Sequence, residues 1–435
     1  MPERKAAAGS LYVDKLNILN LIQKAKYEPL DKIFRDYQVR YEAGKASEFL
    51  IDNALSTFSF IDESIEKNIN TWVKSKPASY VPWVVCGVYF DNAGWTARGS
   101  KFIQDTTNQQ ISKMKFYFNK SKECYKKAIM LNPKLVNAHA GLISIAAANG
   151  YAGEKYKLYK AALVKNSGSY LVHSQYMFYL QEKWGGTPVE MNNILQETQK
   201  YKKLNPDLKR LQGLPDYYKG KALLGKGELK KAQIKFNVSE KFGTSSNLYL
   251  SLSKLNVDLG DLDSAMIHVN NALDIYPQSV NCLKQRGWIY FRMQNYSAAK
   301  KDFSLALKID PTNNSAWQGF AQTLRQLNDV EGALNAFANA IKFDAKDSFS
   351  YWNRGNISLY QLHDAKRAYE DYKEAVRLEP NDDNFVYYEI QALLNLNNKV
   401  ALVNAASRYL KLCKNRQCNP ETLNLIRYIS KLKNK

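Results

Sequence analysis

Apolar residues recur at helical spacing along most of this 435-residue chain. In the first 200 residues, apolar positions three and four apart, separated by polar turns, predict amphipathic helices. The run YVPWVVCGVYF is rich in strand-forming residues, yet Trp83, Gly87 and Phe90 keep helical spacing, so we predict no sheet. The predicted helices span residues 11–26, 30–42, 47–58, 61–74, 80–92, 109–131, 136–149, 154–165, 170–183 and 189–203.

From residue 213 onward the pattern repeats every 34 residues. Counting from Gly287, small or aromatic residues follow at Ala299, Phe303 and Ala306, and Pro311 ends the series. One period later the same places hold Ala333, Phe337 and Ala340. The predicted units are 213–245, 246–279, 280–313, 314–347 and 348–382, and a degenerate repeat with a C-terminal capping helix follows at 383–435.

This pattern has a physical explanation in paired helices. Small residues let two helices approach, an aromatic side chain fills the gap beside them, and proline ends the second helix. The pattern resembles the tetratricopeptide repeat. The resemblance implies an all-α fold in which helical hairpins stack into a right-handed superhelical solenoid with a concave inner surface. Before it we predict an irregular helical region at 1–110 and a degenerate, repeat-like region at 111–212.

Two strings in the first half are not required by periodic packing: GWTARG at 94–99 and KWGG at 183–186. Over residues 30–201 they resemble a bacterial domain of unknown function that precedes tetratricopeptide repeats, which implies a domain boundary and no reaction. We predict that Arg98 lies in a loop or short turn. One hypothesis is a ligand site at Trp95, Arg98 and Trp184, in which Arg98 binds an anion and Trp95 supplies a stacking face. The alternative, which we favour, is that these side chains fill a joint between helices.

No catalytic motif is visible in the sequence. Phosphate-binding loops, dinucleotide fingerprints, nucleophile elbows and zinc-protease motifs are absent, and Gly225 and Gly227 are interpreted as a turn between helices. The five cysteines are odd in number and the four histidines are far apart, which favours reduced, buried thiols over a metal site. We therefore predict a non-enzyme with no catalytic residue, cofactor or metal.

The concave surface of the repeats is the predicted binding site. In this repeat class, the second, fifth, sixth, ninth, twelfth and thirteenth positions of each unit face inward. Their amides suit an extended peptide backbone, and their cations suit carboxylates. We expect Lys284, Arg325 and Asn353 to converge there as exposed side chains. The predicted groove residues are Asn281, Lys284, Gln285, Trp288, Arg292, Gln318, Gln322, Arg325, Trp352, Asn353 and Asn356. The cation and amide pattern with which chaperone-binding members of this repeat class clamp a C-terminal carboxylate is absent.

The net charge of +21 is uneven: residues 111–235 carry a net charge of +15, and the repeats at 246–382 carry −1. A basic face is predicted from Lys113, Lys115, Lys120, Lys202 and Lys203. Charge of this density would attract an acidic protein. Nucleic acid is disfavoured because Lys outnumbers Arg and no nucleic-acid module is present. An anionic membrane surface is a weaker alternative, since no lysine-rich helix has a clean aromatic face.

No apolar run is long enough to span a bilayer and no secretory leader is evident, so we expect a cytoplasmic location, with non-classical export left open. The predicted function is a non-catalytic scaffold or adaptor that binds a protein or peptide in the concave groove. The alternative is an enzymatic or small-ligand-binding N-terminal domain centred on Trp95, Arg98 and Trp184, for which the repeats recruit a substrate.

Overall fold

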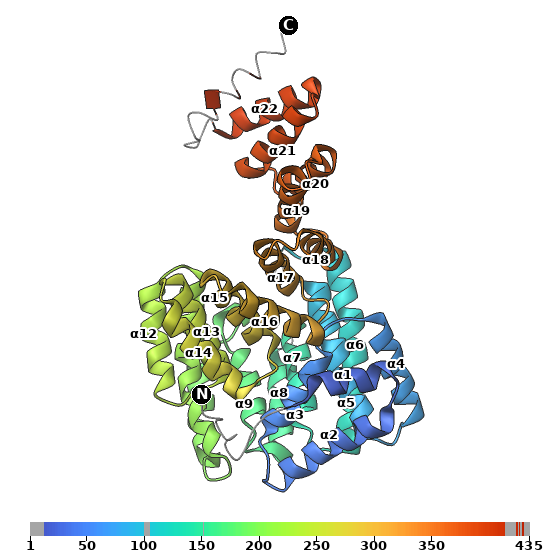
Figure 1. Ribbon diagram of the computed structural model, residues 1–435. Helices are drawn as coiled ribbons and strands as arrows, with labels where there is room; N and C mark the ends of the chain where they lie inside the picture. The colour runs from blue at the N-terminus through green and yellow to red at the C-terminus, as the bar shows by residue number, and fades with distance from the viewer. Residues whose placement is uncertain are drawn as a thin grey trace. The chain divides into compact units, whose positions relative to one another are not determined.

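The computed structural model describes residues 13–99, 105–150 and 152–413 and positions 423, 424, 426 and 429 (Figure 1). These residues form α-helices and short 3-10 helices, and no strand occurs among them, which confirms the all-α prediction. The chain divides into two compact units. The first comprises residues up to Ile289 together with Lys308–Thr312, and the second comprises Tyr290–Leu307 and the residues from Asn313 onward.

The first unit begins with the irregular part of the sequence. Each predicted helix in this part is present, with ends that move by a few residues. The largest change is at residues 93–98, which extend a helix that was predicted to stop at 92. The helices are α1 (Lys15–Gln23), α2 (Tyr27–Glu42), α3 (Glu48–Leu55), α4 (Glu63–Ser75), α5 (Tyr80–Arg98), α6 (Asn108–Leu131), α7 (Val136–Ala148), α8 (Ala152–Asn166), α9 (Tyr170–Phe178) and α10 (Pro188–Thr198), with 3-10 helices η1 (Ser56–Phe58), η3 (Glu182–Trp184), η4 (Gln199–Tyr201) and η5 (Pro206–Gly213).

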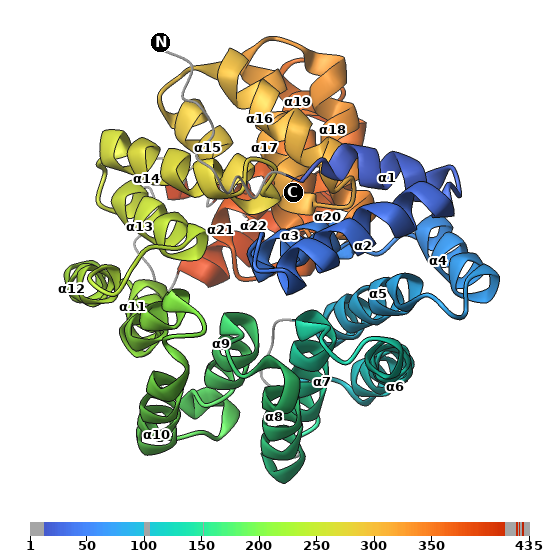
Figure 2. The same ribbon diagram turned by 90° about the horizontal axis from the view of Figure 1, so that it is seen from below.

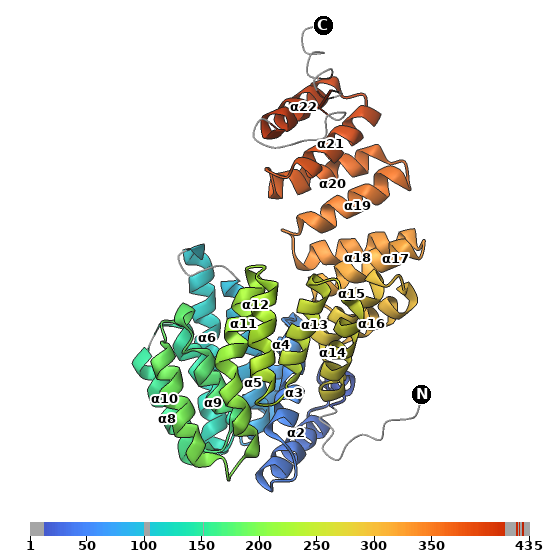
Figure 3. The same cartoon turned by 90° about the vertical axis from the view of Figure 1, so that its left-hand side faces the viewer.

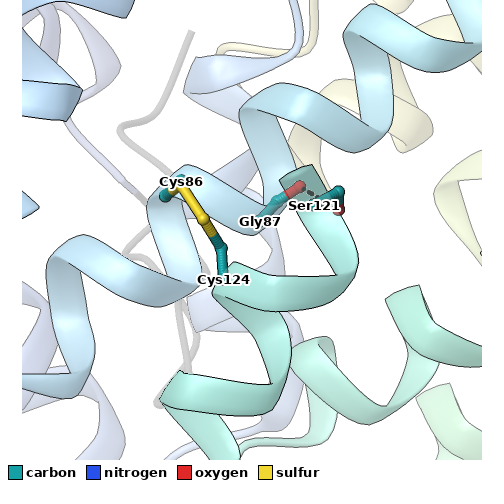
Figure 4. Close-up of a disulfide and its surroundings, with 4 residues drawn as sticks. All are labelled: Cys86, Gly87, Ser121 and Cys124. Carbon is teal, nitrogen blue, oxygen red and sulfur yellow. Dashed lines mark hydrogen bonds between the residues drawn. A yellow bond between two sulfur atoms is a disulfide. The ribbon is translucent and has the colours of Figure 1, made fainter. Parts of the chain in front are cut away.

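Helices α5 and α6 already pack like a repeat unit. A Cβ atom built on Gly87 would lie 2.3 Å from the Tyr125 ring, and one built on Gly141 in α7 would lie 2.2 Å from the same ring. The Tyr125 side chain therefore fills a gap that only glycine leaves open on both sides. The Ser121 hydroxyl donates to the Gly87 carbonyl at 2.7 Å in the same helix crossing (Figure 4).

This crossing also corrects the cysteine prediction. Cys86 and Cys124 form a disulfide between α5 and α6 (Figure 4), with Cα atoms 5.9 Å apart. Cys413 is disulfide-bonded as well, and Cys282 is a free, buried thiol. The prediction of reduced thiols was therefore wrong for three cysteines. For Cys86 and Cys124 the reason is that the packing of α5 on α6 brings together residues 38 positions apart in sequence. Cys418 lies outside the described residues.

The regular repeats form one helix pair per predicted unit. Helices α5–α14 of the first unit follow one another along an arc (Figure 2), and the pairs of the second unit stack in order (Figure 3). The helices are α11 (Leu214–Gly225), α12 (Leu229–Glu240), α13 (Ser246–Asp258), α14 (Leu262–Ile275), α15 (Val280–Arg292), α16 (Tyr296–Ile309), α17 (Asn314–Gln326), α18 (Val330–Phe343), α19 (Ser348–Tyr360), α20 (Ala365–Leu378), α21 (Asp383–Asn395) and α22 (Lys399–Cys413).

Sequence determines the ends and the packing of these pairs. The turn between the paired helices takes a left-handed backbone conformation at the same place in every unit, namely at Gly227, Gly260, Gln294, Asn328, His363 and Asn397. The aromatic residues Phe303, Phe337 and Tyr372 are fully buried, as predicted. A Cβ atom on Gly355 would lie 2.7 Å from the Tyr372 ring, which explains the glycine that faces the aromatic residue in this unit. The predicted C-terminal capping helix lies largely outside the described residues.

Candidate functional site

A cavity of about 550 Å³ follows the inner surface of the first repeats. Every residue that lines it occupies one of the inward positions given by the 34-residue register. They are Asn247 and Asn281 at the second position, Tyr217 and Leu250 at the fifth, Ser251 and Gln285 at the sixth, Lys221 and Lys254 at the ninth, Leu224 and Val257 at the twelfth, and Gly225 and Asp258 at the thirteenth. This cavity is the concave groove of the repeats in the first unit.

A larger cavity of about 800 Å³ adjoins this groove. Tyr217, Lys221, Asn247 and Asn281 line both cavities, so the two are contiguous. The larger cavity has the N-terminal helices as its second wall, through residues that include Asp52 and Ser56. It is therefore enclosed jointly by the irregular N-terminal region and the first repeats, an arrangement that the sequence did not predict.

Polar contacts of α1 and α3 hold this second wall in place. The backbone N–H of Lys15 donates to Oε1 of Gln278 at 2.9 Å, and its ammonium donates to Oγ of Ser56 at 2.7 Å. At the start of α3, the Glu48 carboxylate accepts hydrogen bonds from the backbone N–H of Tyr170, at 2.6 Å, and from the Ser169 hydroxyl. Because these donors form the first turn of α9, the Glu48 carboxylate satisfies N–H groups that a helix start leaves unpaired.

Burial changes the ionisation of the charged groups in this wall. It raises the pKa of Glu48 to about 7, against the opposing effect of its hydrogen bonds, and the pKa of Asp52 to about 6, against Lys15 and Asn137. Burial also lowers the pKa of Lys15 to about 8, although the Asp52 carboxylate opposes that shift. The charged forms of all three groups are thus costly to bury, and their contacts offset only part of that cost.

Four of the predicted groove residues belong to α15 in the first unit. Asn281 and Gln285 line the groove, and Asn281 is exposed. Lys284 is half-buried, which lowers the pKa of its ammonium, and Trp288 is half-buried too. The structure therefore brings Asn281 and Gln285 together with residues of the two preceding units.

The groove residues predicted in the second unit are largely occupied with one another. Nε2 of Gln322 donates to Oδ1 of Asn353 at 2.9 Å, and Arg325 donates to the same oxygen at 3.4 Å. Asn353 and Gln322 are only 1% and 6% exposed, so the expectation of an exposed side chain was wrong for Asn353. They are buried because the amides link α17 to α19 across adjacent repeats.

The remaining predicted residues of this unit also have structural contacts. Gln318 donates to Asp347 at 2.9 Å, and Asn356 accepts from the Tyr372 hydroxyl at 2.8 Å. Trp352 packs on Tyr388, with ring centroids 5.4 Å apart. Arg292 is exposed at the end of α15.

The two N-terminal strings meet in space, but in a form different from the predicted loop. Trp95 and Arg98 lie in the last turns of α5, which continues to Arg98, so the prediction of a loop was wrong. The Arg98 guanidinium lies 5.7 Å from the ring centroids of both Trp95 and Trp184, and the two indole rings are 5.9 Å apart. Gly94 lies within α5 and leaves room for the Phe118 ring of α6, because a Cβ atom there would lie 2.4 Å from that ring.

The KWGG string is explained by backbone geometry. Gly185 has a left-handed φ of 76°, and a Cβ atom on Gly186 would lie 2.3 Å from backbone atoms of Leu180. Both glycines are therefore needed to bring Trp184 back over α5. Trp95, Arg98 and Trp184 line neither of the two cavities, and together they fill a joint between helices.

The lysines of the predicted basic face lie on α6 and after η4. Lys113 and Lys115 are exposed on α6, and the Lys120 ammonium lies over the Phe116 ring, 4.6 Å from its centroid. Lys202 and Lys203 are exposed after η4. That these lysines act as one face stays a prediction.

Sequence reasoning missed Lys221 of the groove, although a signal for it was available. Lys221 and Lys254 both occupy the ninth position of their units. Extending the inward positions to the unit at 213–245 would have identified Lys221, Tyr217 and Tyr218. Lys183, Glu48 and Asp52 carry no such signal, because they lie outside the repeat register.

No three or more histidine, cysteine or acidic residues lie close enough to hold a metal ion in the part of the chain that the structure describes. No helix among these residues is both long and apolar enough to span a lipid bilayer.

Two protein-family models match parts of this chain. The family "Tetratricopeptide repeat" matches residues 280–313, the span of one predicted unit. The family "Domain of unknown function (DUF4034)" matches residues 15–153, which covers α1–α7 and so supplies the second wall of the larger cavity. The match overlaps the predicted span of 30–201 and ends before the KWGG string at 183–186.

Individual relatives share only short regions with this chain. The DnaJ homolog subfamily C member 7 homolog of Dictyostelium discoideum is 30% identical over 109 residues, which are 24% of this chain and 20% of that protein. The Protein CTR9 homolog of Arabidopsis thaliana is 25% identical over 132 residues, 29% of this chain and 12% of that protein. The chain thus spans a fifth or less of these relatives.

Among solved structures, Pseudomonas aeruginosa pilF is similar with a TM-score of 0.42 and 12% identity, covering 47% of this chain and 93% of that one. Tetratricopeptide repeats bind proteins or peptides, so the repeat match suggests a protein-interaction scaffold.

Proposed function

We propose that this protein is a non-catalytic scaffold that binds a segment of a partner protein along the concave inner surface of its repeats. The observation that carries the proposal is the 550 Å³ groove, in which every lining residue occupies an inward position of the register. Its exposed Asn247, Lys221 and Lys254 side chains can hydrogen-bond an extended chain without first breaking contacts within the protein. The polar groups of the second unit are less available, since several already bond to one another.

Site-specific photocrosslinking tests this proposal. A benzophenone amino acid would replace Gln285 inside the groove or, as a control, Ile234, which is 61% exposed on the second helix of its repeat. After irradiation in cells that make the protein, one defined partner should be captured from Gln285 and not from Ile234. Equal capture from both positions, or capture from Ile234 alone, would place the binding surface elsewhere.

The competing function, an enzyme or small-ligand domain centred on Trp95, Arg98 and Trp184, is not favoured. Burial raises the pKa of the neighbouring Asp91 to about 7, which is a feature found at catalytic sites. However, Arg98 already lies between two indole rings, and neither described cavity reaches it. A packed joint of this kind supports a structural role for the strings.

The location of the protein stays a prediction. The sequence favoured the cytoplasm, whereas the Cys86–Cys124 disulfide weighs against it, because disulfides persist mainly in oxidising compartments. Alkylation of the denatured protein from its native cells, followed by mass spectrometry, decides between them. Modification of Cys86 without prior reduction would support a reducing compartment, and modification only after reduction would support an oxidising one.

The same disulfide gives a measurable effect on stability. It closes a loop with a sequence separation of 38 residues, so its reduction should lower the free energy of unfolding by roughly 2–4 kcal/mol. Urea denaturation with and without a reductant measures this effect. Reduction of a variant with Cys86→Ser and Cys124→Ser is the control and should change the unfolding curve little.

A further inference from the structure

We propose that the two adjoining cavities of the first unit form one site for an acidic, extended peptide segment, with the N-terminal helices as part of its wall. This inference rests on the proposed scaffold function and adds to it the location of the site and the chemistry of the partner. It is carried by an excess of unpaired lysines along the inner wall and by free amides in equivalent positions.

Lysines from three separate helices line this wall. Lys183 of η3 and Lys221 of α11 line the larger cavity, and Lys221 and Lys254 of α13 line the groove. None of the three forms an ion pair with an acidic side chain among the residues that the structure describes. Partial burial lowers the pKa of Lys221, although its side chain is still exposed, and the positive charges of Lys254 and Lys183 lower that pKa further, so both of these ammonium groups repel that of Lys221.

Lys284 extends the basic wall to the next repeat. Burial lowers the pKa of its ammonium, Asp310 opposes that shift, and Lys254 adds to it. Lys284 also has no ion pair in the described part of the chain, although Asp310 is near enough to act on it. Lys183, Lys221 and Lys254 therefore line the two cavities, and Lys284 lies near enough to Lys254 for their positive charges to repel each other.

The acidic residues at the cavities compensate this charge only in part. Asp52 accepts a hydrogen bond from Asn137 at 2.9 Å and lies near Lys15, on the opposite wall from the lysines. Asp310 accepts from the backbone N–H and hydroxyl of Thr312. Asp258 lies at the thirteenth position, at the end of its helix. Arg210 pairs with Asp207 at 3.5 Å, so it does not belong to the cations that lack an acidic partner.

The amides of the groove indicate that the acidic ligand is an extended chain. Asn247 and Asn281 occupy the second position of successive units, and their exposed side chains make no hydrogen bond to other described residues. A carboxamide both donates and accepts, so it can pair with the N–H and C=O of a peptide backbone. Such amides recur along the groove with the period of the repeats, and the lysines beside them match carboxylates.

The test uses fluorescence anisotropy with the intact chain and a fluorescein-labelled peptide of alternating glutamate and serine. A matched peptide with glutamine in place of glutamate measures the contribution of charge. The inner variant carries Lys221→Glu and Lys254→Glu, and the control carries Lys113→Glu and Lys115→Glu on α6, which change the net charge equally. We expect the inner variant to weaken binding of the acidic peptide by at least about tenfold and the control by less than about twofold.

Salt dependence and folding complete the experiment. Affinity of the wild type for the acidic peptide should fall steeply between about 50 and 300 mM salt, because the Debye length shortens. If the glutamate variant unfolds, a variant with Lys221→Gln and Lys254→Gln should still weaken binding several-fold. Equal losses in the inner and control variants, or equal binding of both peptides, would overturn the proposal. A single-stranded oligonucleotide that displaces the peptide and binds more tightly would also overturn it.

This outcome is distinguishable from failure of the scaffold function itself. If a partner crosslinks from Gln285 equally in the wild type and in the inner variant, the groove binds a partner but does not select acidic ones. If no partner crosslinks from Gln285, the scaffold function at this groove fails as well.

Discussion

Glu48 should make the stability of the first unit decrease as pH rises. Its carboxyl is 3% exposed, and burial raises its pKa from the ordinary value of 4.5 to about 7. The folded state therefore binds this proton more tightly than the unfolded chain does. The resulting stabilisation is complete below about pH 4.5 and is lost as pH rises through about 7.

The size of the effect follows from the shift. One pKa unit corresponds to about 1.4 kcal/mol, so the difference between the folded and ordinary pKa values of Glu48 corresponds to about 3 kcal/mol. Glu48→Gln removes the titration and keeps a carbonyl oxygen that can accept from the Tyr170 N–H. Relative to this variant, the wild type should lose about 3 kcal/mol of unfolding free energy between about pH 4.5 and 8.

Urea denaturation followed by tryptophan fluorescence at a series of pH values measures this difference. The control is Glu63→Gln, an exposed glutamate in the first turn of α4, whose curve should run parallel to that of the wild type. Asp52 titrates in the same wall, so the difference between wild type and Glu48→Gln is the informative quantity. Parallel pH profiles for these two proteins would refute the assignment of Glu48 as a buried, unfavourable charge.

Two further pairs of variants test the packing. Phe337→Ala should lower the free energy of unfolding of the second unit by about 3–5 kcal/mol through a cavity, while Phe343→Ala on the same helix, 38% exposed, should cost less than about 1 kcal/mol in urea denaturation. Gly186→Ala should cost about 1–3 kcal/mol because its Cβ meets the Leu180 backbone, whereas Gly153→Ala, with open space in α8, should be neutral or stabilising in thermal denaturation. Similar effects in both members of either pair would contradict the packing described above.

The repeats could be predicted because their packing contacts join residues that are close in sequence. Gly220 and Phe236 lie 16 residues apart, and a Cβ on Gly220 would lie 2.6 Å from the Phe236 ring, so the contact recurs with the sequence period. The groove follows from the same register. The second wall could not be predicted, because Glu48 meets Ser169 across 121 residues and no period connects them. Asn353 shows a different limit of the register. Its position in the repeat was predicted to face the groove, but its side chain accepts a hydrogen bond from the Gln322 amide on the adjacent repeat and is not free to bind a partner.

The contact between Lys15 and Gln278 joins residues 263 positions apart. In an ordinary solenoid each repeat touches only its neighbours, so the array can fray from an end and tolerates truncation. The first unit cannot fold repeat by repeat in this way, because α1 and α3 form hydrogen bonds to residues that are synthesised much later. Its contact order is correspondingly high, which predicts slow folding and cooperative unfolding of the unit as one block. A fragment ending at residue 153, where the DUF4034 match stops, would leave Lys15 and Glu48 without these partners.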